Sequence, residues 1–532
     1  MKLTDRGLRD SASWQAAGIA LPGYDRAAMS EATRKAPIWL HFGAGNLFRA
    51  FPAMCQQKLL NDQMARCGVT VADSAGMVDK VLQPHDNLSV VVRLCPDGRM
   101  EKEVLGSIGE SLRLLEDAPR LQDVFCQKSL QMVSFTITEK GYRLTDGQGC
   151  YADDVEHDLM AGPEFCVSYM GRVAAMLYRR YLAGAYPLAM VSMDNCSHNG
   201  DHLLNAMLTM ARSWEESGVC QKGFADYVSD PSRVAFPWTM IDKITPRPDA
   251  AVQEKLLECG LEDMGGYVTR RGSYTAPFVN AEETQYLVVE DAFPNGRPPL
   301  ECAGVLFTNR ETVEKVERMK VCTCLNPLHT ALAVFGCLLG YRKICDEMRD
   351  ADLAALVKRI GYQEGLPVVT DPGVLSPKEF LDDVIEKRLP NPFLPDTPQR
   401  IACDTSQKIP VRFGETIKAY LKRPEADLQS LKMIPLVFAA WCRYLMGVDD
   451  RGQPFEVSPD PMAAQLQGYL ADAHLGDPRR RETLLKPILS NAELFGVDLY
   501  AAGLARKVEE DFFAMLEGPG AVRSLLRRRL AE

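Results

Sequence analysis

A lysine, an amide and an imidazole occur close together in the segment 317–329, as Lys320, Asn326 and His329. From residue 326 to Gly340, apolar residues recur at helical spacing and also fill the other faces, so the sequence predicts a helix that is buried all round. A lysine can donate a proton, and an amide or an imidazole can hydrogen-bond to an oxygen of a ligand. Because such groups are costly to bury without partners, they favour a functional site.

The same residues also have a purely structural interpretation. Asn326 followed by Pro327 is typical of a helix N-cap with proline at the first helical position. Lys320, which precedes this cap, could be a solvated charge, and His329 could be a core histidine with its hydrogen bonds satisfied. The rest of the chain is needed to choose between these interpretations.

Length and charge limit the possible classes of protein. A chain of 532 residues is long enough for two or more domains, and its 46% hydrophobic and 25% charged residues are ordinary for a soluble globular protein. The net charge of −10 argues against nucleic acid as the main partner. If the substrate is an anion, the cations that hold it must be local.

The cysteines and the chain start indicate a cytoplasmic protein. Sixteen cysteines are scattered along the chain, which suggests reduced thiols, and the charged start has no apolar signal segment. Cys322 and Cys324 are too close for the usual paired zinc ligands and no second pair follows, so we expect no metal. The apolar runs near 321–341 and 433–448 contain polar residues, so we expect no membrane partner.

A strand, a glycine turn and a helix near the start suit a dinucleotide. The apolar segment 38–42 runs into Gly43 and Gly45, and an amphipathic helix with Asn46 and Arg49 follows. Glycines let the backbone approach a pyrophosphate, and the helix N-terminus faces its negative charge. The third glycine of the usual fingerprint is replaced by Phe48, so a plain turn is the alternative.

A second strand, 69–73, ends in Asp73, roughly where a ribose-binding carboxylate should fall. A carboxylate would accept hydrogen bonds from a 2′-hydroxyl and repel a 2′-phosphate, which favours NAD over NADP. The alternative is that Asp73 only caps the following turn.

Further strand-like segments at 88–94, 131–138 and 188–193 alternate with helical stretches at 164–182 and 201–217. Such alternation predicts an α/β, Rossmann-type, doubly wound and mostly parallel sheet. Its ligands should gather at the carboxyl ends of the strands, where Gly43, Asp73, Glu139 and Asn195 lie.

From about residue 321 the pattern is almost wholly helical. Candidate helices are 327–339, 349–361, 412–423, 426–447, 459–474, 480–490 and 501–517. We therefore expect an N-terminal α/β domain, 1–319, and an all-α C-terminal domain, 320–532.

Seven motifs together resemble the polyol-specific long-chain dehydrogenases, the family that includes mannitol 2-dehydrogenase and fructuronate (mannonate) reductase. They are HFGAGNLFRA, TEKGY, SMDNCSHNGD, FPWTMIDKITP, VVEDAFPNGRPPLE, ERMKVCTCLNPLHTALA and QRIACDTSQKIPVR, in family order from about residue 20 to residue 420. The resemblance implies metal-independent hydride transfer with NAD(H) and a lysine as the acid/base.

The resemblance also implies a role for each matching residue. Lys320 is similar to the family's proton donor, Asn195 and Asn326 to the amides that stabilise the oxyanion, His329 to the substrate-binding histidine, Glu317 to the acid of the proton path and Asp242 to a further active-site acid. Arg400 and Lys408 match the substrate-contacting pair. Gly43, Gly45, Asn46, Arg49, Asp73 and Glu139 are the expected cofactor-binding residues.

Two departures from the family pattern are visible. Six residue steps separate Lys320 from Asn326, where the common motif has five, and a bulge could absorb the extra residue. The usual FHRAH after the glycines is LFRAF here, which keeps Arg49 and removes two histidines.

The extra residue and the segments 79–80 and 84–88 are more similar to the fructuronate reductase branch than to the mannitol branch. The resemblance thus implies reversible, NADH-dependent reduction of D-fructuronate to D-mannonate by this chain. Oxidation of mannitol or arabinitol and reduction of tagaturonate are alternatives, and a catalytically idle NAD(H) and sugar-acid sensor is the alternative from another class. Physiological direction and oligomeric state stay open.

Overall fold

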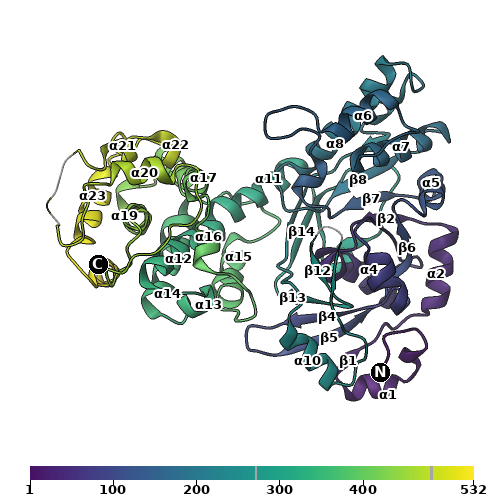
Figure 1. Cartoon of the computed structure of the whole chain (residues 1–532), viewed down its shortest axis with the longest axis horizontal. Helices are drawn as coiled ribbons and strands as arrows, with labels where there is room; N and C mark the ends of the chain where they lie inside the picture. The colour runs from purple at the N-terminus through teal and green to yellow at the C-terminus, as the bar shows by residue number, and fades with distance from the viewer. Residues whose placement is uncertain (270–271, 478, 480–482) are drawn as a thin grey trace. The chain divides into compact units, whose positions relative to one another are not determined.

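The structure is a computed structural model that describes residues 1–269, 272–477, 479 and 483–532 (Figure 1). The chain divides into two compact units, which are described separately. Unit 1 comprises Met1–Cys95 and Arg99–Glu314, and unit 2 comprises Pro96–Gly98 and Lys315–Glu532. The division falls inside helix α11 (Arg310–Met319), and the boundary expected from the sequence lies at the end of the same helix.

Unit 1 is built on a six-stranded sheet in the order β6-β3-β2-β7-β8-β9, with all neighbours parallel. The strands are β2 (Trp39–Phe42), β3 (Val69–Asp73), β6 (Ile108–Arg113), β7 (Met132–Phe135), β8 (Leu188–Ser192) and β9 (Val234–Ala235). Counted along the chain, this is the 3-2-1-4-5-6 order of the doubly wound dinucleotide-binding fold. The predicted fold class is confirmed.

Both faces of this sheet are buried, which explains why its strands read as continuous apolar runs. Successive side chains of β2 alternate between the faces, so Leu40 and Phe42 join one core while Trp39 joins the other. Helices α5, α7 and α8 cover the first face and α4 covers the second (Figure 1). These helices are α4 (Pro52–Asn61), α5 (Ala118–Cys126), α7 (Tyr169–Leu182) and α8 (Asn199–Glu216).

One predicted strand belongs to a different sheet. The segment expected at 88–94 forms β4 (Ser89–Leu94), which pairs antiparallel with β5 (Met100–Leu105) and parallel with β13 (Phe278–Glu282). The short turn between β4 and β5 permits only a hairpin, because a parallel neighbour would need a long crossover. The expectation that this strand lies in the main sheet was therefore wrong.

A smaller sheet in the order β10-β14-β15 follows later in unit 1. Its strands are β10 (Thr239–Asp242), β14 (Tyr286–Glu290) and β15 (Leu306–Thr308). It matters for function because β10 ends in Asp242, a predicted site residue.

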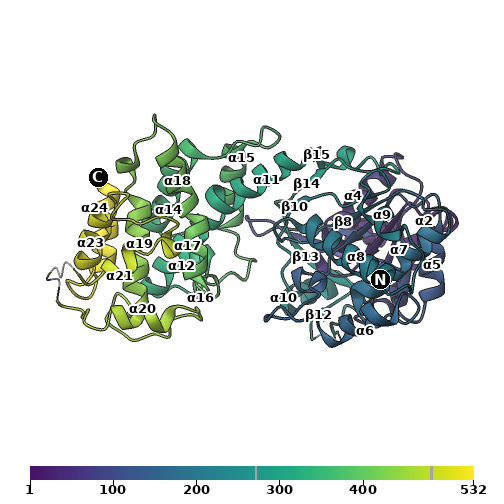
Figure 2. The ribbon, with the colours of Figure 1, turned by 90° about the horizontal axis from the view of Figure 1, so that it is seen from above.

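In the described residues of unit 2 from Lys315 onward, the regular elements are helices, as predicted. Its core helices α12 (Asn326–Leu339) and α19 (Met433–Leu445) are buried along nearly their whole length and contact each other (Figure 2). Helices α16 (Pro398–Ile401) and α17 (Thr405–Arg412) also pack against α12.

Some predicted helices have different bounds. The helix expected at 426–447 begins only at Met433, because the buried carboxylate of Glu364 accepts hydrogen bonds from the backbone N–H groups of residues 432–434 at 2.6, 2.6 and 2.8 Å. A distant cap of this kind leaves no signal near the helix start. For the helix expected at 480–490, residues 480–482 lie outside the described residues, and α21 spans Lys486–Leu489.

Among the described residues, one helical run, Arg310–Leu339, is long and apolar enough by length and composition to cross a membrane. Of the residues in its most apolar 18-residue window, 83% are buried inside the protein. Packing against other helices accounts for this apolar character.

A buried acid, Glu347, packs beside α12. Glu347, in the short helix α13 (Ile344–Glu347), is fully buried, and neither of its carboxyl oxygens has a hydrogen bond within the described chain. A Cβ at Gly336 would lie 2.2 Å from Oε1 of this acid, so the glycine makes room for it. Burial, with Asp350 and Asp346 adding to it, raises the pKa of Glu347 well above 4.5.

This acid should make stability depend on pH. The unfolded chain releases the Glu347 proton near its ordinary pKa, while the folded protein retains it, so stability falls by about 1.4 kcal/mol per pH unit as pH rises between the two values. Glu347→Gln cannot ionise. The free energy of unfolding of this variant, measured in urea, should therefore rise relative to that of the wild type as the pH increases above the ordinary glutamate pKa, by at most that amount per pH unit. A gap that stays constant, as expected for the exposed control Glu425→Gln, would contradict this.

Candidate active site

The carboxyl edge of the parallel sheet carries four predicted site residues. Gly43 follows β2, Asp73 ends β3 and Asn195 follows β8. Glu139 begins the 3-10 turn after β7 and is exposed, with an ion pair to Arg143 at 2.5 Å. Because the strands are parallel, these ends lie at one edge of the sheet, as predicted.

The glycine turn after β2 has a shape that suits a ligand. Gly43 has a φ of +105°, and a Cβ there would lie 2.4 Å from the Thr136 carbonyl oxygen, so this position requires glycine. Gly45 precedes the short helix α3 (Asn46–Ala50), and a Cβ there would meet no atom within 4 Å. The open space beside the Gly45 backbone fits a dinucleotide pyrophosphate.

Phe48, which replaces the third glycine of the fingerprint, belongs to the core. It is fully buried and stacks on His41 with ring centroids 3.9 Å apart and an interplanar angle of 10°. Burial lowers the pKa of His41 to about 3, so the ring is neutral. The aromatic stack fills the space in which a glycine would normally allow close helix–strand packing.

Asp73 caps the turn after β3 and still has an oxygen to offer a ligand. Its Oδ2 accepts hydrogen bonds from the backbone N–H groups of Ala75 at 2.6 Å and Met77 at 3.1 Å, so it caps the following turn. No described residue donates a hydrogen bond to Oδ1. A carboxylate has acceptor sites to spare, so Asp73 can hold the turn and a ribose hydroxyl at once.

Arg49, expected to bind the cofactor, is a buried structural residue instead. Its guanidinium is fully buried and donates to Ser89 Oγ at 3.1 Å, the Ala276 carbonyl at 2.8 Å, Thr275 Oγ1 at 2.9 Å and Asn46 Oδ1 at 3.1 Å. Burial lowers its pKa to about 9. With no exposed surface to touch a cofactor, Arg49 positions Asn46 in place of the predicted direct contact.

Asp194, which the sequence reasoning missed, ties the end of β8 to the turn after β7. Its carboxylate accepts hydrogen bonds from the backbone N–H groups of Ile137 and Thr138, both at 2.9 Å, and from the Tyr142 hydroxyl at 2.6 Å. Burial raises the pKa of Asp194, against the effect of these bonds. Thr138 has a φ of +66°, which is uncommon for a β-branched residue. The available signal was an acid directly after a buried strand.

The two other predicted residues of unit 1 lie on adjacent elements. Asn195 is exposed after β8, and Asp242, at the end of β10, is 5% exposed. Asn199 joins these elements, because its Nδ2 donates to the carbonyls of Asp194 and Thr239, each at 3.0 Å. The Asn195 amide is thus accessible to a ligand at the edge of the sheet.

In unit 2, Lys320 begins a π-helical turn, Lys320–Cys324, that links α11 to α12. The backbone N–H of Leu325 donates to the Lys320 carbonyl at 3.1 Å, five residues back. A π turn holds one residue more than an α turn, so it absorbs the extra residue before Asn326 in the way expected of a bulge. Lys320 is 4% exposed. Helix on both sides therefore fixes this lysine.

Asn326 is not a helix cap, so this part of the sequence interpretation was wrong. It is the first residue of α12, and the N-cap position is Leu325, which makes no side-chain cap bond. The preceding π turn already engages the backbone at this point. No residue in the described ranges hydrogen-bonds to the half-exposed Asn326 side-chain amide, which leaves it available to a ligand.

His329 is held by an acid that the sequence reasoning did not identify. Its Nε2 lies 3.5 Å from Oδ2 of Asp396, whose other oxygen accepts a hydrogen bond from Arg400. Burial acts to raise the pKa of Asp396, but the contacts with His329 and Arg400 prevail and lower it. Asp396 thus orients two predicted site residues. In the sequence it looked like the start of an ordinary Asp-Thr-Pro turn.

Lys408 and Glu317 complete the predicted set. The Lys408 ammonium donates to the carbonyls of Ile401 at 3.2 Å and Cys403 at 2.5 Å, and burial lowers its pKa. Glu317 lies one helical turn before Lys320 on α11 and is partly exposed. Together with the π turn and α12, this places Glu317, Lys320, Asn326 and His329 along one helical segment of unit 2.

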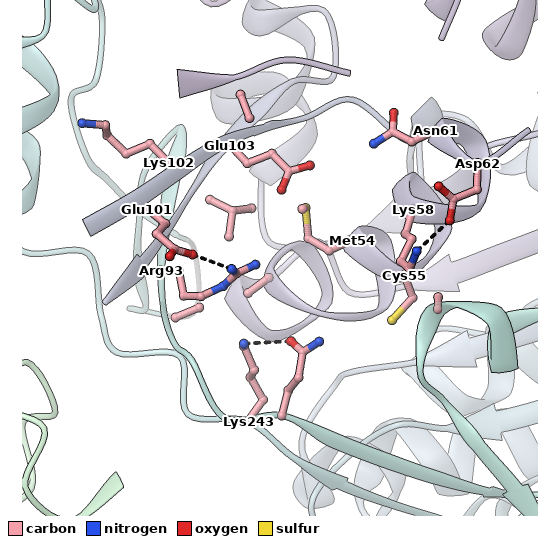
Figure 3. A pocket seen from close by; sticks show the side chains of 16 residues that line it. Met54, Cys55, Lys58, Asn61, Asp62, Arg93, Glu101, Lys102, Glu103 and Lys243 are labelled. Carbon is pink, nitrogen blue, oxygen red and sulfur yellow. Dashed lines mark hydrogen bonds and ion pairs between the residues drawn. The ribbon is translucent and has the colours of Figure 1, made fainter. Parts of the chain in front are cut away.

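Each unit of the described chain contains a cavity. A cavity of about 470 Å³ in unit 1 is lined by α4, β4 and β5 (Figure 3), and its charges are largely paired, as in Arg93–Glu101 and Lys58–Asp62, each at 2.6 Å. No predicted site residue lines it. A cavity of about 740 Å³ in unit 2 has Arg400 in its wall. In the part of the chain that the structure describes, no group of three or more His, Cys, Asp or Glu could hold a metal ion.

Comparison with known proteins places both units in one family. Residues 37–302 match the family model described as the mannitol dehydrogenase Rossmann domain, and residues 312–516 match the mannitol dehydrogenase C-terminal domain. The chain belongs to the mannitol dehydrogenase family. The resemblance inferred from the motifs is thereby confirmed.

Members of the mannitol dehydrogenase family match over nearly the whole chain. A D-mannonate oxidoreductase of Thermotoga maritima is 50% identical over 99% of this chain and 98% of its own length. A mannitol 2-dehydrogenase of Cereibacter sphaeroides is 30% identical over 92% and 96%.

Two solved structures share the fold. The mannitol 2-dehydrogenase of Pseudomonas fluorescens, a ternary complex with NAD and D-mannitol, is 27% identical, with a TM-score of 0.69 and full coverage of both chains. A substrate-free D-sorbitol dehydrogenase is 26% identical, with a TM-score of 0.76, covering 93% of this chain and 94% of its own.

Proposed function

We propose that this chain catalyses the reversible, NADH-dependent reduction of D-fructuronate to D-mannonate. The observation that carries the proposal is the 50% identity, along nearly the full length of both chains, to a D-mannonate oxidoreductase. The mannitol 2-dehydrogenases match at about 30% identity or below, which favours a sugar acid over a neutral polyol as the substrate.

The residues at the edge of the parallel sheet fit NAD(H). Gly43 and Gly45 leave room for the pyrophosphate, the Asn46 side chain is held beside them by Arg49, and Asp73 offers an acceptor to the ribose. When bound, the reduced nicotinamide supplies the hydride that goes to the carbonyl carbon.

The remaining site residues protonate and hold the substrate in this proposal. The Lys320 ammonium donates a proton to the carbonyl oxygen in reduction, and the amine accepts it in oxidation. The side-chain amides of Asn195 and Asn326 donate hydrogen bonds to that oxygen as its negative charge develops. His329, oriented by Asp396, hydrogen-bonds to a substrate hydroxyl. Glu317 serves the proton path, Asp242 is a further acid of the active site, and Arg400 and Lys408 hold the substrate.

Asp73→Ser tests the ribose contact. Removing a charged acceptor should weaken NADH binding by roughly 10- to 100-fold and reduce the preference for NADH over NADPH, because the repulsion of a 2′-phosphate is lost. Both dissociation constants can be measured by NADH and NADPH fluorescence. If the cofactor preference is unchanged, the ribose is held elsewhere.

The proposed activity is tested by absorbance at 340 nm with NADH and three ketones: D-fructuronate, D-tagaturonate and D-fructose. The proposal expects the highest kcat/KM with D-fructuronate. A preference for D-fructose would support the polyol branch of the mannitol dehydrogenase family instead. NADH binding without turnover of any ketone would support a sensor.

A small sugar acid is the partner implied by this reaction, and the cytoplasm is its proposed location. All sixteen cysteines are free in the structure. Free thiols persist in reducing compartments, which supports this location.

A further inference from the structure

A second arginine lies beside the residues proposed to hold the substrate. Arg412, the last residue of α17, donates from Nη1 to Thr330 Oγ1 at 2.7 Å, and that hydroxyl donates to the Asn326 carbonyl at 3.0 Å. Asn326, His329 and Thr330 stand at positions i, i+3 and i+4 of α12, so they share one face of its first turn. The Arg412 guanidinium therefore contacts the turn that carries the oxyanion amide and the substrate histidine.

Within the described residues, no carboxylate pairs with the Arg412 guanidinium. Thr330 is the one hydrogen-bond acceptor that the described residues give it, and no salt bridge to it is formed within them. Burial lowers its pKa to about 10, and no charged neighbour opposes this effect. Lys408, one helical turn earlier on α17, is a second cation, and Arg412 contributes to lowering its pKa.

Arg400 is in a different electrostatic state. It pairs with Asp396, which also contacts His329, so its charge is already offset and its geometry is tied to that of the histidine. Arg318 is likewise paired, with Glu415 at 2.8 Å. Of these three arginines, Arg412 is the one whose positive charge is not paired with a described carboxylate.

We propose that Arg412 binds the substrate carboxylate and selects sugar acids over neutral ketoses. This inference rests on the proposed reduction of a keto-uronate. A half-buried guanidinium without an anion is unfavourable, and a ligand carboxylate would offset that cost with charge-assisted hydrogen bonds. Lys408 adds positive potential at the same place. The network through Thr330 would set the distance between the carboxylate and the reacting carbonyl.

The test compares two substrates that differ at one group. D-Fructose carries a hydroxymethyl group where D-fructuronate carries the carboxylate. In Arg412→Gln, kcat/KM for D-fructuronate should fall by roughly 10- to 100-fold, the loss expected for a hydrogen bond between charged groups, while kcat/KM for D-fructose stays nearly unchanged. The control Arg423→Gln removes an arginine that donates to the carbonyls of Pro367 and Val369, and it should leave both values unchanged.

Further outcomes decide the inference. Equal losses on both substrates, or no loss on either, would overturn it while the proposed function stands. A wild-type enzyme that does not reduce D-fructuronate would overturn the proposed function itself, and this inference with it. If circular dichroism shows that Arg412→Gln does not fold, Arg412→Lys is used in its place. Lysine keeps the positive charge but lacks the planar guanidinium, so the ratio of kcat/KM for D-fructuronate to kcat/KM for D-fructose should still fall. An unchanged ratio would overturn the inference.

Discussion

Lys320→Ala should lower kcat for ketone reduction by roughly 10² to 10⁴ while NADH affinity stays nearly unchanged. The side chain is 4% exposed and fixed in a π turn of unit 2, whereas the residues that fit the cofactor belong to unit 1. Removing the amine therefore takes away the proposed proton donor without touching the nucleotide contacts. Stopped-flow measurement of NADH oxidation and a fluorescence titration separate the two effects.

The matched control for this variant is Lys358→Ala, which removes an exposed lysine at the end of α14 (Ala351–Lys358) in the same unit. It should retain wild-type turnover. A Lys320→Ala enzyme with normal kcat would exclude the lysine from the chemistry.

Asn326→Ala should lower kcat/KM by roughly 10² to 10³, the usual cost of losing one oxyanion donor. Its thermal stability should be nearly unchanged, because the amide caps no helix and no described residue hydrogen-bonds to it. A true cap would cost about 1 kcal/mol on truncation. The pair of measurements therefore separates an oxyanion donor from a cap.

Asn491→Ala is the comparison for the cap. Asn491 is the N-cap of α22 (Ala492–Phe495) and accepts a hydrogen bond from the backbone N–H of Glu493 at 2.9 Å. This variant should lose stability and keep activity. If Asn326→Ala behaves like Asn491→Ala, the oxyanion role is wrong.

The sequence predicted the central strands of the parallel sheet well because their signals are local. Strand β3 was placed at its observed bounds, Val69–Asp73, by a continuous apolar run that ends in an acid. The glycine turn was visible because Gly43 needs a positive φ, a requirement that its residue type expresses directly. Patterns within a few residues therefore sufficed to place β2, β3, β7 and β8, whereas β6 and β9 of the same sheet were not predicted.

Contacts between distant segments could not be predicted in this way. Asp396 lies far along the chain from His329, and Glu364 caps α19 from outside that helix, so neither role leaves a local pattern. The expected helix cap at Asn326 was wrong, and it was expected because Asn-Pro is a common helix start. The π turn that removes the need for a cap depends on α11 continuing through Lys320.

Chemical rescue of Lys320→Ala by methylamine tests the central claim most directly. The amine should enter the space that the lysine side chain vacates and restore D-fructuronate reduction in proportion to its concentration, with Lys358→Ala unaffected by it. Failure of methylamine and of other small primary amines to restore any turnover, in a variant that still folds and binds NADH, would contradict proton donation by Lys320.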